Sequence, residues 1–208
     1  MKGLNRKSHE FNRHWFGSAP ELTQRDNTAT SRSLLFGCPD HAVLPHCLPV
    51  RNPMSFLIVQ FVGITIPEVH DPAAVAVSEI LNKAFCTYDV SDLIICTHTN
   101  CAIFEGWLKA PANSRLRFGC EQTHPTLKFI DHWYPDVFEM EKFGLFLREH
   151  ILLQLEHLIL YDAVRCRLEA SELKLHCWLF DDLSRRIRAF DPLMGEFVSV
   201  DSDALSSR

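Results

Sequence analysis

Two short apolar segments of this chain each run directly into residues that bind metals. The sequence LLFG is followed by Cys38 and Asp40, and the sequence LIIC is followed by His98 and Cys101. Two thiols, one imidazole and one carboxylate suit zinc better than magnesium or calcium, which prefer oxygen ligands. Three protein ligands leave a fourth position open for chemistry, whereas four close the site. The pattern therefore predicts a zinc site assembled from two distant segments.

Strand-like and helix-like segments alternate along the chain. Strands are expected at residues 33–37, 56–62, 93–96 and 173–180, followed by a turn at 184–186 and a short strand that ends at 190. Helices are expected at residues 72–85, 125–133, 137–160 and 163–170, and also directly after Asn100. This alternation predicts an α/β domain with a mainly parallel central β-sheet flanked by helices. Sites in such sheets gather beyond the carboxyl ends of strands, where both ligand pairs fall.

Composition divides the chain into an arm, a domain and a tail. Residues 1–32 are polar and form an N-terminal arm and loop, with an amphipathic helix expected around His9–Phe16. Residues 33–200 are expected to form a single zinc-binding domain, and residues 201–208 a C-terminal tail. A chain of 208 residues, 47% of them hydrophobic, is long and apolar enough for one sizeable core.

Charge and cysteine usage narrow the partners and the compartment. A formal net charge of -5 and a pI near 6.1 argue against a nucleic-acid partner. No apolar stretch reaches the ~20 residues that a membrane span needs, so no membrane partner is expected. The N-terminus lacks the apolar run of a secretory signal, and the eight cysteines therefore indicate reduced thiols and metal ligands in the cytoplasm.

The ligand pairs belong to a longer series of ordered motifs. These are CPD at residues 38–40, HTNC at 98–101, LHCW at 175–178 and FDP at 190–192. In this order they resemble the β-class carbonic anhydrases, whose motifs read Cys-x-Asp-Ser-Arg, Gly-His-x-x-Cys-Gly, Leu-His-Gly-Trp and Tyr-Asp-Pro. The segment from Asn12 to Trp15 looks like the family's amino-terminal arm, which packs on a neighbouring subunit. The resemblance spans roughly residues 10–198.

The resemblance implies a site, an activity and an assembly. Cys38, His98 and Cys101 would bind Zn²⁺, and zinc-bound hydroxide would convert carbon dioxide reversibly to bicarbonate. Asp40 would accept a hydrogen bond from this hydroxide and orient it, which makes it the candidate catalytic residue. The family's subunit contacts imply a homodimer or a higher even homo-oligomer.

The chain also departs from the family pattern around the zinc ligands. The arginine that pairs with the motif aspartate is replaced by Ala42, and a glutamine near the substrate would align with Ala29. A polar strand motif is replaced by VQFVGI at residues 59–64, which predicts a more apolar cleft. Without the arginine fork, we hypothesise that Asp40 swings onto the zinc as its fourth ligand and closes the site.

Two other functions remain open, together with simpler structural roles. The chain could be a zinc-binding member of the fold with little activity and an assembly role, or a hydrolase of carbon disulfide or carbonyl sulfide. Asp40 could cap a turn or helix. The repeated Glu-His pairs at 149–150 and 156–157 are interpreted as a solvated stripe, and His176 as a structural residue.

Overall fold

One mixed β-sheet forms the centre of the protein in a computed structural model, which describes residues 9–25, 31–40, 48–109, 126, 130, 132–135 and 139–200. Its strands are β1 (Arg32–Gly37), β2 (Phe56–Gln60), β3 (Val90–His98), β4 (Lys174–Asp181), β5 (Arg186–Asp191) and β6 (Glu196–Ser199). Their order is β2-β1-β3-β4-β5-β6, in which the first four are parallel and the last two antiparallel. The expected α/β class is confirmed.

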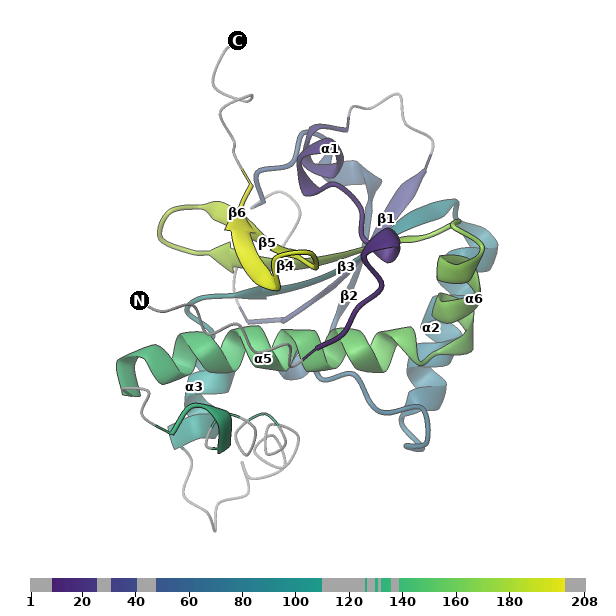
Figure 1. Cartoon of the computed structure of the whole chain (residues 1–208). Coiled ribbons are helices and arrows are strands. Elements are labelled where there is room, and N and C mark those ends of the chain that lie inside the picture. The colour runs from purple at the N-terminus through teal and green to yellow at the C-terminus, as the bar shows by residue number, and fades with distance from the viewer. Residues whose placement is uncertain are drawn as a thin grey trace.

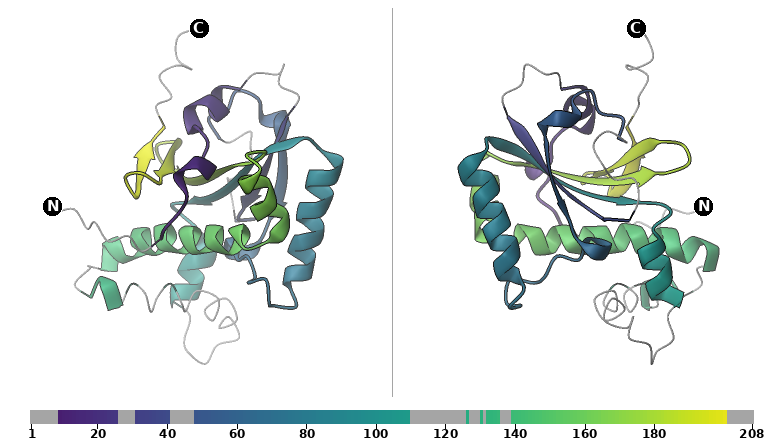
Figure 2. Two further views of the ribbon diagram at one scale, coloured as in Figure 1. Left: turned by 45° about the vertical axis from the view of Figure 1, so that its right-hand side comes forward. Right: turned by 180° about the vertical axis from the view of Figure 1, so that it is seen from behind.

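Helices cover both faces of this sheet. They are η1 (Arg13–Trp15), α1 (Ala19–Gln24), η2 (Pro53–Ser55), η3 (Val62–Ile64), α2 (Ala74–Thr87), α3 (Ala102–Lys109), α5 (Glu139–Ile159) and α6 (Asp162–Glu169). The long helix α5 runs across one face, and α1 lies on the other (Figure 1). Helices α2 and α6 contact each other at one end of α5 (Figure 2).

The central strands are buried because both of their faces are covered. All of β3 except Ser91 is buried, and six consecutive residues of β4 are buried as well. Strands with two covered faces read as continuous apolar runs, because neither face is in contact with water. The larger of two apolar clusters lies on the α5 side, and the smaller one, around Trp178, lies on the α1 side.

Several boundaries differ from the sequence-based expectations. The helix expected at His9–Phe16 was wrong: only the single turn η1 forms, with its first turn capped by the Asn12 side chain. Beyond it, Phe16 forms a bridge with Leu175 of β4, which holds this part of the arm in an extended path. The strand expected to reach Val62 ends at Gln60, and α1 and β6 were not anticipated. The helix expected at 125–133 lies largely outside the described residues.

The arm is attached to α5 by a half-buried histidine. His9 lies 2.8 Å from Glu156 and 3.2 Å from Glu149, and burial, which lowers its pKa, is outweighed by these carboxylates, so that the pKa rises to about 9. Glu149 and His150 are themselves buried. The interpretation of the Glu-His pairs as a solvated stripe was therefore wrong for the first pair, and Glu156 and His157 of the second pair are half-buried. No helix among the described residues has the length and apolarity to cross a membrane.

An ion pair joins the arm to the sheet near the start of β3, at the opposite end of this strand from His98. The Asp92 carboxylate lies 2.7 Å from Arg25 and 2.9 Å from His176. Burial alone would raise the pKa of Asp92, but hydrogen bonds from His176, Arg25 and Ser91 lower it to about 2. His176 thus has the structural role that the sequence predicted.

We expect Asp92→Asn to lower the free energy of unfolding by about 2 kcal/mol near neutral pH. Because the pKa of folded Asp92 lies below its unfolded value of 3.8, this stabilisation is present above that value and is lost as the pH falls toward 2. Urea denaturation of both proteins across this range measures the difference. Asp162→Asn, which removes an exposed pair with Arg165, is the control and should cost less than about 1 kcal/mol. A deficit in Asp92→Asn that does not shrink in acid would contradict this assignment.

Candidate metal centre

The predicted ligands Cys38, His98 and Cys101 converge at the carboxyl ends of two neighbouring strands. Cys38 directly follows β1, and His98 is the last residue of β3. These strands pair in parallel, with Gly37 opposite Cys96, so both ligands leave the same edge of the sheet. Cys101 follows after a two-residue turn and immediately precedes α3.

The ligand atoms form one buried group. The sulfur atoms of Cys38 and Cys101 are 3.8 Å apart, and these two atoms and a ring nitrogen of His98 all lie within 4.8 Å of one another. All three residues are at most 1% exposed. Among the described residues, this is the one such group of three or more His, Cys, Asp or Glu side chains.

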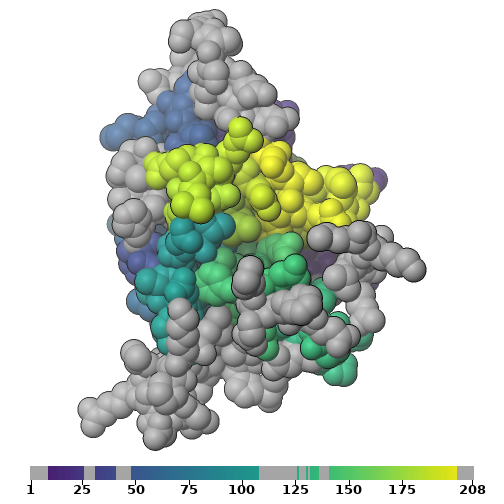
Figure 3. Space-filling model, turned by 90° about the vertical axis from the view of Figure 1, so that its left-hand side faces the viewer, coloured from purple at the N-terminus to yellow at the C-terminus, as the bar shows by residue number. Residues whose placement is uncertain are grey.

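A carboxylate outside the group fixes the orientation of His98. Asp182 Oδ2 lies 2.9 Å from His98 Nδ1 and also accepts a hydrogen bond from the Asn100 amide at 3.1 Å. In return, the Asp182 amide donates to Thr99 Oγ1. The β4–β5 turn that carries Asp182 therefore lies against the start of α3, as the lime and teal surfaces in Figure 3 show. With Nδ1 engaged, Nε2 is the atom left to bind a metal.

The two thiols share their protons unequally. The pKa of Cys38 is lowered to about 5, because the hydrogen bond with Cys101, together with His98 and the backbone amides of Asp40 and Gly63, outweighs burial, which raises it. The same bond with Cys38, together with burial, raises the pKa of Cys101. Burial lowers the pKa of His98, but Cys38 and Asp182 more than offset this and raise it. The group thus holds negative charge and protons that a divalent cation would displace.

This donor set fits zinc. His98 Nε2 is buried and has no hydrogen-bond partner among the described residues, although a buried polar atom normally has one. Two sulfur atoms bound tetrahedrally at about 2.3 Å from zinc would lie about 3.8 Å apart, which is the separation seen here. Cys38, His98 and Cys101 are thus the residues that would hold the ion.

Asp40 lies beside the three ligands but outside their group. Its Oδ2 accepts a hydrogen bond from the Ala102 amide at 2.5 Å, at the N-terminal end of α3. It is also close enough to Cys101 to raise the pKa of that thiol. The contact corresponds to the helix-capping role considered for this residue, while its roles as orienting group and as fourth ligand stay predictions. Ala42 and Ala29 lie outside the described residues.

Two residues near the centre were missed from the sequence. Asp182 lies in the turn after β4, where an aspartate is unremarkable, and only its contact with His98 reveals it. Gly63 lies within the segment VQFVGI and has a φ of 63°, a backbone conformation that the sequence does not reveal. The polar character of Asp181-Asp182 at a strand end was the one available signal, because sites gather at such ends.

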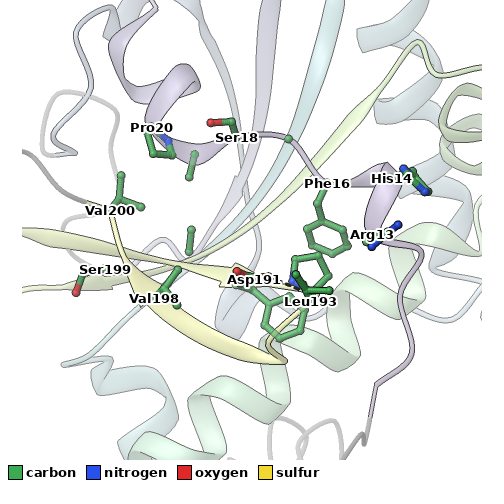
Figure 4. A pocket seen from close by; sticks show the side chains of 15 residues that line it. Arg13, His14, Phe16, Ser18, Pro20, Asp191, Leu193, Val198, Ser199 and Val200 are labelled. Carbon is green, nitrogen blue, oxygen red and sulfur yellow. Dashed lines mark hydrogen bonds between the residues drawn. The ribbon is translucent and has the colours of Figure 1, made fainter.

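A groove elsewhere on the surface does not include the metal ligands. It has a volume of about 450 Å³ and lies between the arm and the β5–β6 hairpin (Figure 4). Phe16, Ser18, Asp191 and Leu193 are among the residues that line it. None of the three ligands borders this groove, so it is separate from the candidate metal centre.

The chain is similar in sequence to known carbonic anhydrases. The family profile described as Carbonic anhydrase matches residues 33–184. Carbonic anhydrase 1 of Escherichia coli O157:H7 is 28% identical over 205 residues, which cover 92% of this chain and 88% of the relative. The carbonic anhydrase of Pseudomonas aeruginosa is 25% identical over 171 residues, which cover 81% of this chain and 77% of the relative.

Solved structures show the same fold. The β-carbonic anhydrase CcaA is similar with a TM-score of 0.72 at 22% identity, covering 82% of this chain and 84% of that chain. One of two tetrameric β-carbonic anhydrases from Sordaria macrospora is similar with a TM-score of 0.66 at 15% identity, covering 77% and 80%.

We expect Asp182→Asn to weaken zinc binding by about 10- to 100-fold, because the amide no longer fixes the ring and basicity of His98 as a carboxylate does. Competition with a chromophoric chelator measures the dissociation constant. Asp191→Asn is the matched control, since Asp191 accepts hydrogen bonds from Leu193 and Met194 in the next hairpin turn. Equal affinities for the Asp182 and Asp191 variants would count against this role of Asp182.

Proposed function

The chain belongs to the β-class carbonic anhydrase family, and we propose that it is a zinc-dependent carbonic anhydrase, which hydrates carbon dioxide reversibly to bicarbonate. The observation that carries this proposal is the convergence of Cys38, His98 and Cys101 into one buried group, with Nε2 of His98 left without a partner.

Each residue of the centre has a task in this proposal. When bound, zinc lowers the pKa of a coordinated water to about 7 and so supplies a nucleophile for carbon dioxide. Cys38, His98 and Cys101 hold the ion, and Asp182 keeps His98 in the tautomer that presents Nε2. The burial of the ligands strengthens the electrostatic interactions among these groups.

Asp40 is proposed to accept a hydrogen bond from the hydroxide that a bound zinc ion would supply. In the family pattern an arginine fork would hold this carboxylate, but the chain has Ala42 there. The Ala102 amide at the start of α3 is the donor that engages it instead, and the positive end of the helix dipole favours a carboxylate at this place. This contact supports an open fourth position. Rotation of Asp40 away from Ala102 and onto the zinc would close it.

A weakly active zinc-binding protein is the second candidate. It is favoured by the apolar segment that replaces the family's polar strand motif. Phe61 stacks on Phe36 with 5.9 Å between ring centroids, and Val62 is 56% exposed. Ile64, which the sequence placed in the cleft, lies instead in the core at 1% exposure. The segment thus offers apolar side chains where the family has polar ones.

Compartment and assembly are further parts of the proposal. We expect a cytoplasmic protein, because Cys86 and Cys166 are exposed free thiols of the kind that a reducing compartment preserves. We also expect a homodimer or a higher even homo-oligomer. The tetrameric proteins of Sordaria macrospora are relatives of that kind.

The direct test is a stopped-flow carbon dioxide hydration assay on protein of measured zinc content. We expect about one zinc ion per chain and turnover that rises with pH through neutrality, as the nucleophile forms. Cys101→Ala should remove both the metal and the activity, whereas Cys86→Ala, at an exposed thiol, should retain both. Stoichiometric zinc without turnover at any pH would favour the second candidate.

Restoring the missing arginine tests whether its loss limits catalysis. We expect Ala42→Arg to raise kcat/KM for carbon dioxide by about tenfold, which corresponds to one charge-assisted hydrogen bond of about 1.4 kcal/mol to Asp40. Ala42→Lys is the matched control, because it adds the charge without the planar fork and should gain less. If neither substitution changes kcat/KM, the arginine is not what limits this chain.

A further inference from the structure

The segment that leaves β2 passes the metal centre in a strained conformation. We call residues 61–67 the 61–67 loop. Gly63 has a φ of 63° and Ile64 a φ of 49°, both in the left-handed region. For a residue with a side chain this region costs roughly 1–2 kcal/mol, and the β-branched Ile64 is fully buried there as well. A conformation of this kind persists only where the surrounding structure enforces it.

Gly63, which precedes the strained Ile64, contacts a metal ligand. The Gly63 amide donates a hydrogen bond to the sulfur of Cys38 and lowers the pKa of that thiol. The opposite side of Gly63 is covered by α3: a Cβ atom at this position would lie 2.2 Å from the Trp107 ring and 3.2 Å from the Phe104 ring. Gly63 therefore fits between the sulfur and α3 only without a side chain.

Helix α5 and the residues that follow it hold the loop by its backbone. His150 Nε2 is 3.1 Å from the Gly63 carbonyl, and Gln154 Oε1 accepts from the Ile66 amide at 2.7 Å. His157 Nδ1 is 2.7 Å from the Ile66 carbonyl, and the Tyr161 hydroxyl donates to the Pro67 carbonyl at 2.7 Å. We call these four side chains the α5 clamp, whose members are His150, Gln154, His157 and Tyr161.

The spacing and protonation of the clamp suit this task. His150, Gln154 and His157 follow one another in α5 at intervals of four and three residues, which places them along one helical face, and Tyr161 lies just beyond the end of this helix. A carbonyl oxygen only accepts, so His150 carries its proton on Nε2, and burial lowers the pKa of this ring to about 4. His150 is thus neutral at physiological pH, and its Nδ1 lies 3.4 Å from the Thr126 hydroxyl.

Gly63 is the residue that links the α5 clamp to the metal centre. His150 binds the carbonyl of Gly63, and the amide of Gly63 donates to the sulfur of Cys38. Gln154 and His157 fix Ile66, three residues further along the loop. Loss of these bonds would let the Gly63–Ile64 pair relax out of the left-handed region, and the amide would then turn away from the sulfur.

We propose that the α5 clamp positions the Gly63 amide on the sulfur of Cys38 and thereby sets the zinc affinity of the centre. Its members are positioning residues, since they touch neither the metal nor the substrate. This inference rests on the proposed zinc site. It assigns the polar face of α5 a role at the metal centre, through Gly63, in addition to its contribution to stability.

The sharpest test compares two substitutions at one position. His150→Leu removes the donor to Gly63, whereas His150→Gln keeps an N–H donor of similar reach. We expect His150→Leu to weaken zinc binding by about 10-fold or more and His150→Gln to restore most of that loss. Chelator competition measures the dissociation constant, and the sulfur-to-metal absorption bands of the cobalt(II) form report the geometry at Cys38. These bands should shift in His150→Leu and return in His150→Gln.

A second variant and a control separate positioning from stability. Gln154→Met keeps the volume but removes the acceptor for Ile66, and should weaken zinc binding in the same direction. Leu22→Ala creates a cavity in the smaller apolar cluster, on the α1 side of the sheet, and should destabilise the fold while zinc affinity changes less than about 3-fold. Unchanged affinity and cobalt spectra in both His150→Leu and Gln154→Met would overturn the inference while the proposed function stands. Failure of the unaltered chain to bind zinc would overturn both.

Discussion

The parallel pairing of β1 with β3 is the constraint on which the site depends. Cys38 and His98 are sixty positions apart in the chain, yet the register that sets Gly37 opposite Cys96 brings both to the same edge of the sheet. The pairing is fixed by burial. In β1, Leu34 and Phe36 belong to the larger apolar cluster on one face of the sheet, and Leu35 belongs to the smaller cluster on the other face. A shift of one residue would turn every side chain of β1 to the opposite face, which would bury Cys38 away from His98 and Cys101.

Sequence patterns predicted those parts of the fold whose residues carry their own signal. The apolar runs that become β1 and β3, and the ligands that follow them, were found because burial on both faces makes such strands uniformly apolar. The helix expected at His9–Phe16 failed because long-range contacts override local periodicity there. Phe11 and Phe16 pack against Phe190, and Phe16 pairs with Leu175. β6 was missed because its four residues are too few to show a period.

The polar side chains of α5 show why the remainder of the site could not be predicted. A Glu-His pair repeated after seven residues looks like a wet helical face in isolation, because the partners that bury it lie elsewhere in the chain. His9 comes from the arm, 140 or more residues away, and the carbonyls of Gly63 and Ile66 belong to the 61–67 loop. Asp182 escaped notice for the same reason. Every residue has a backbone carbonyl, so the sequence does not indicate which carbonyls accept hydrogen bonds from side chains.

At this centre, backbone amides donate the hydrogen bonds to anionic groups that a cationic side chain could otherwise supply. Four of them engage the anionic groups: those of Asp40 and Gly63 donate to Cys38, that of Ala102 donates to Asp40, and that of Asn100 donates to Asp182. Such dipoles are fixed by the fold and need no reorganisation when charge changes beside them. An arginine would bring a full charge and a fork, but also a long side chain that must be ordered. Negative charge that is balanced by amides depends instead on the loops that carry them, which makes the conformation of Gly63 part of the chemistry of the centre.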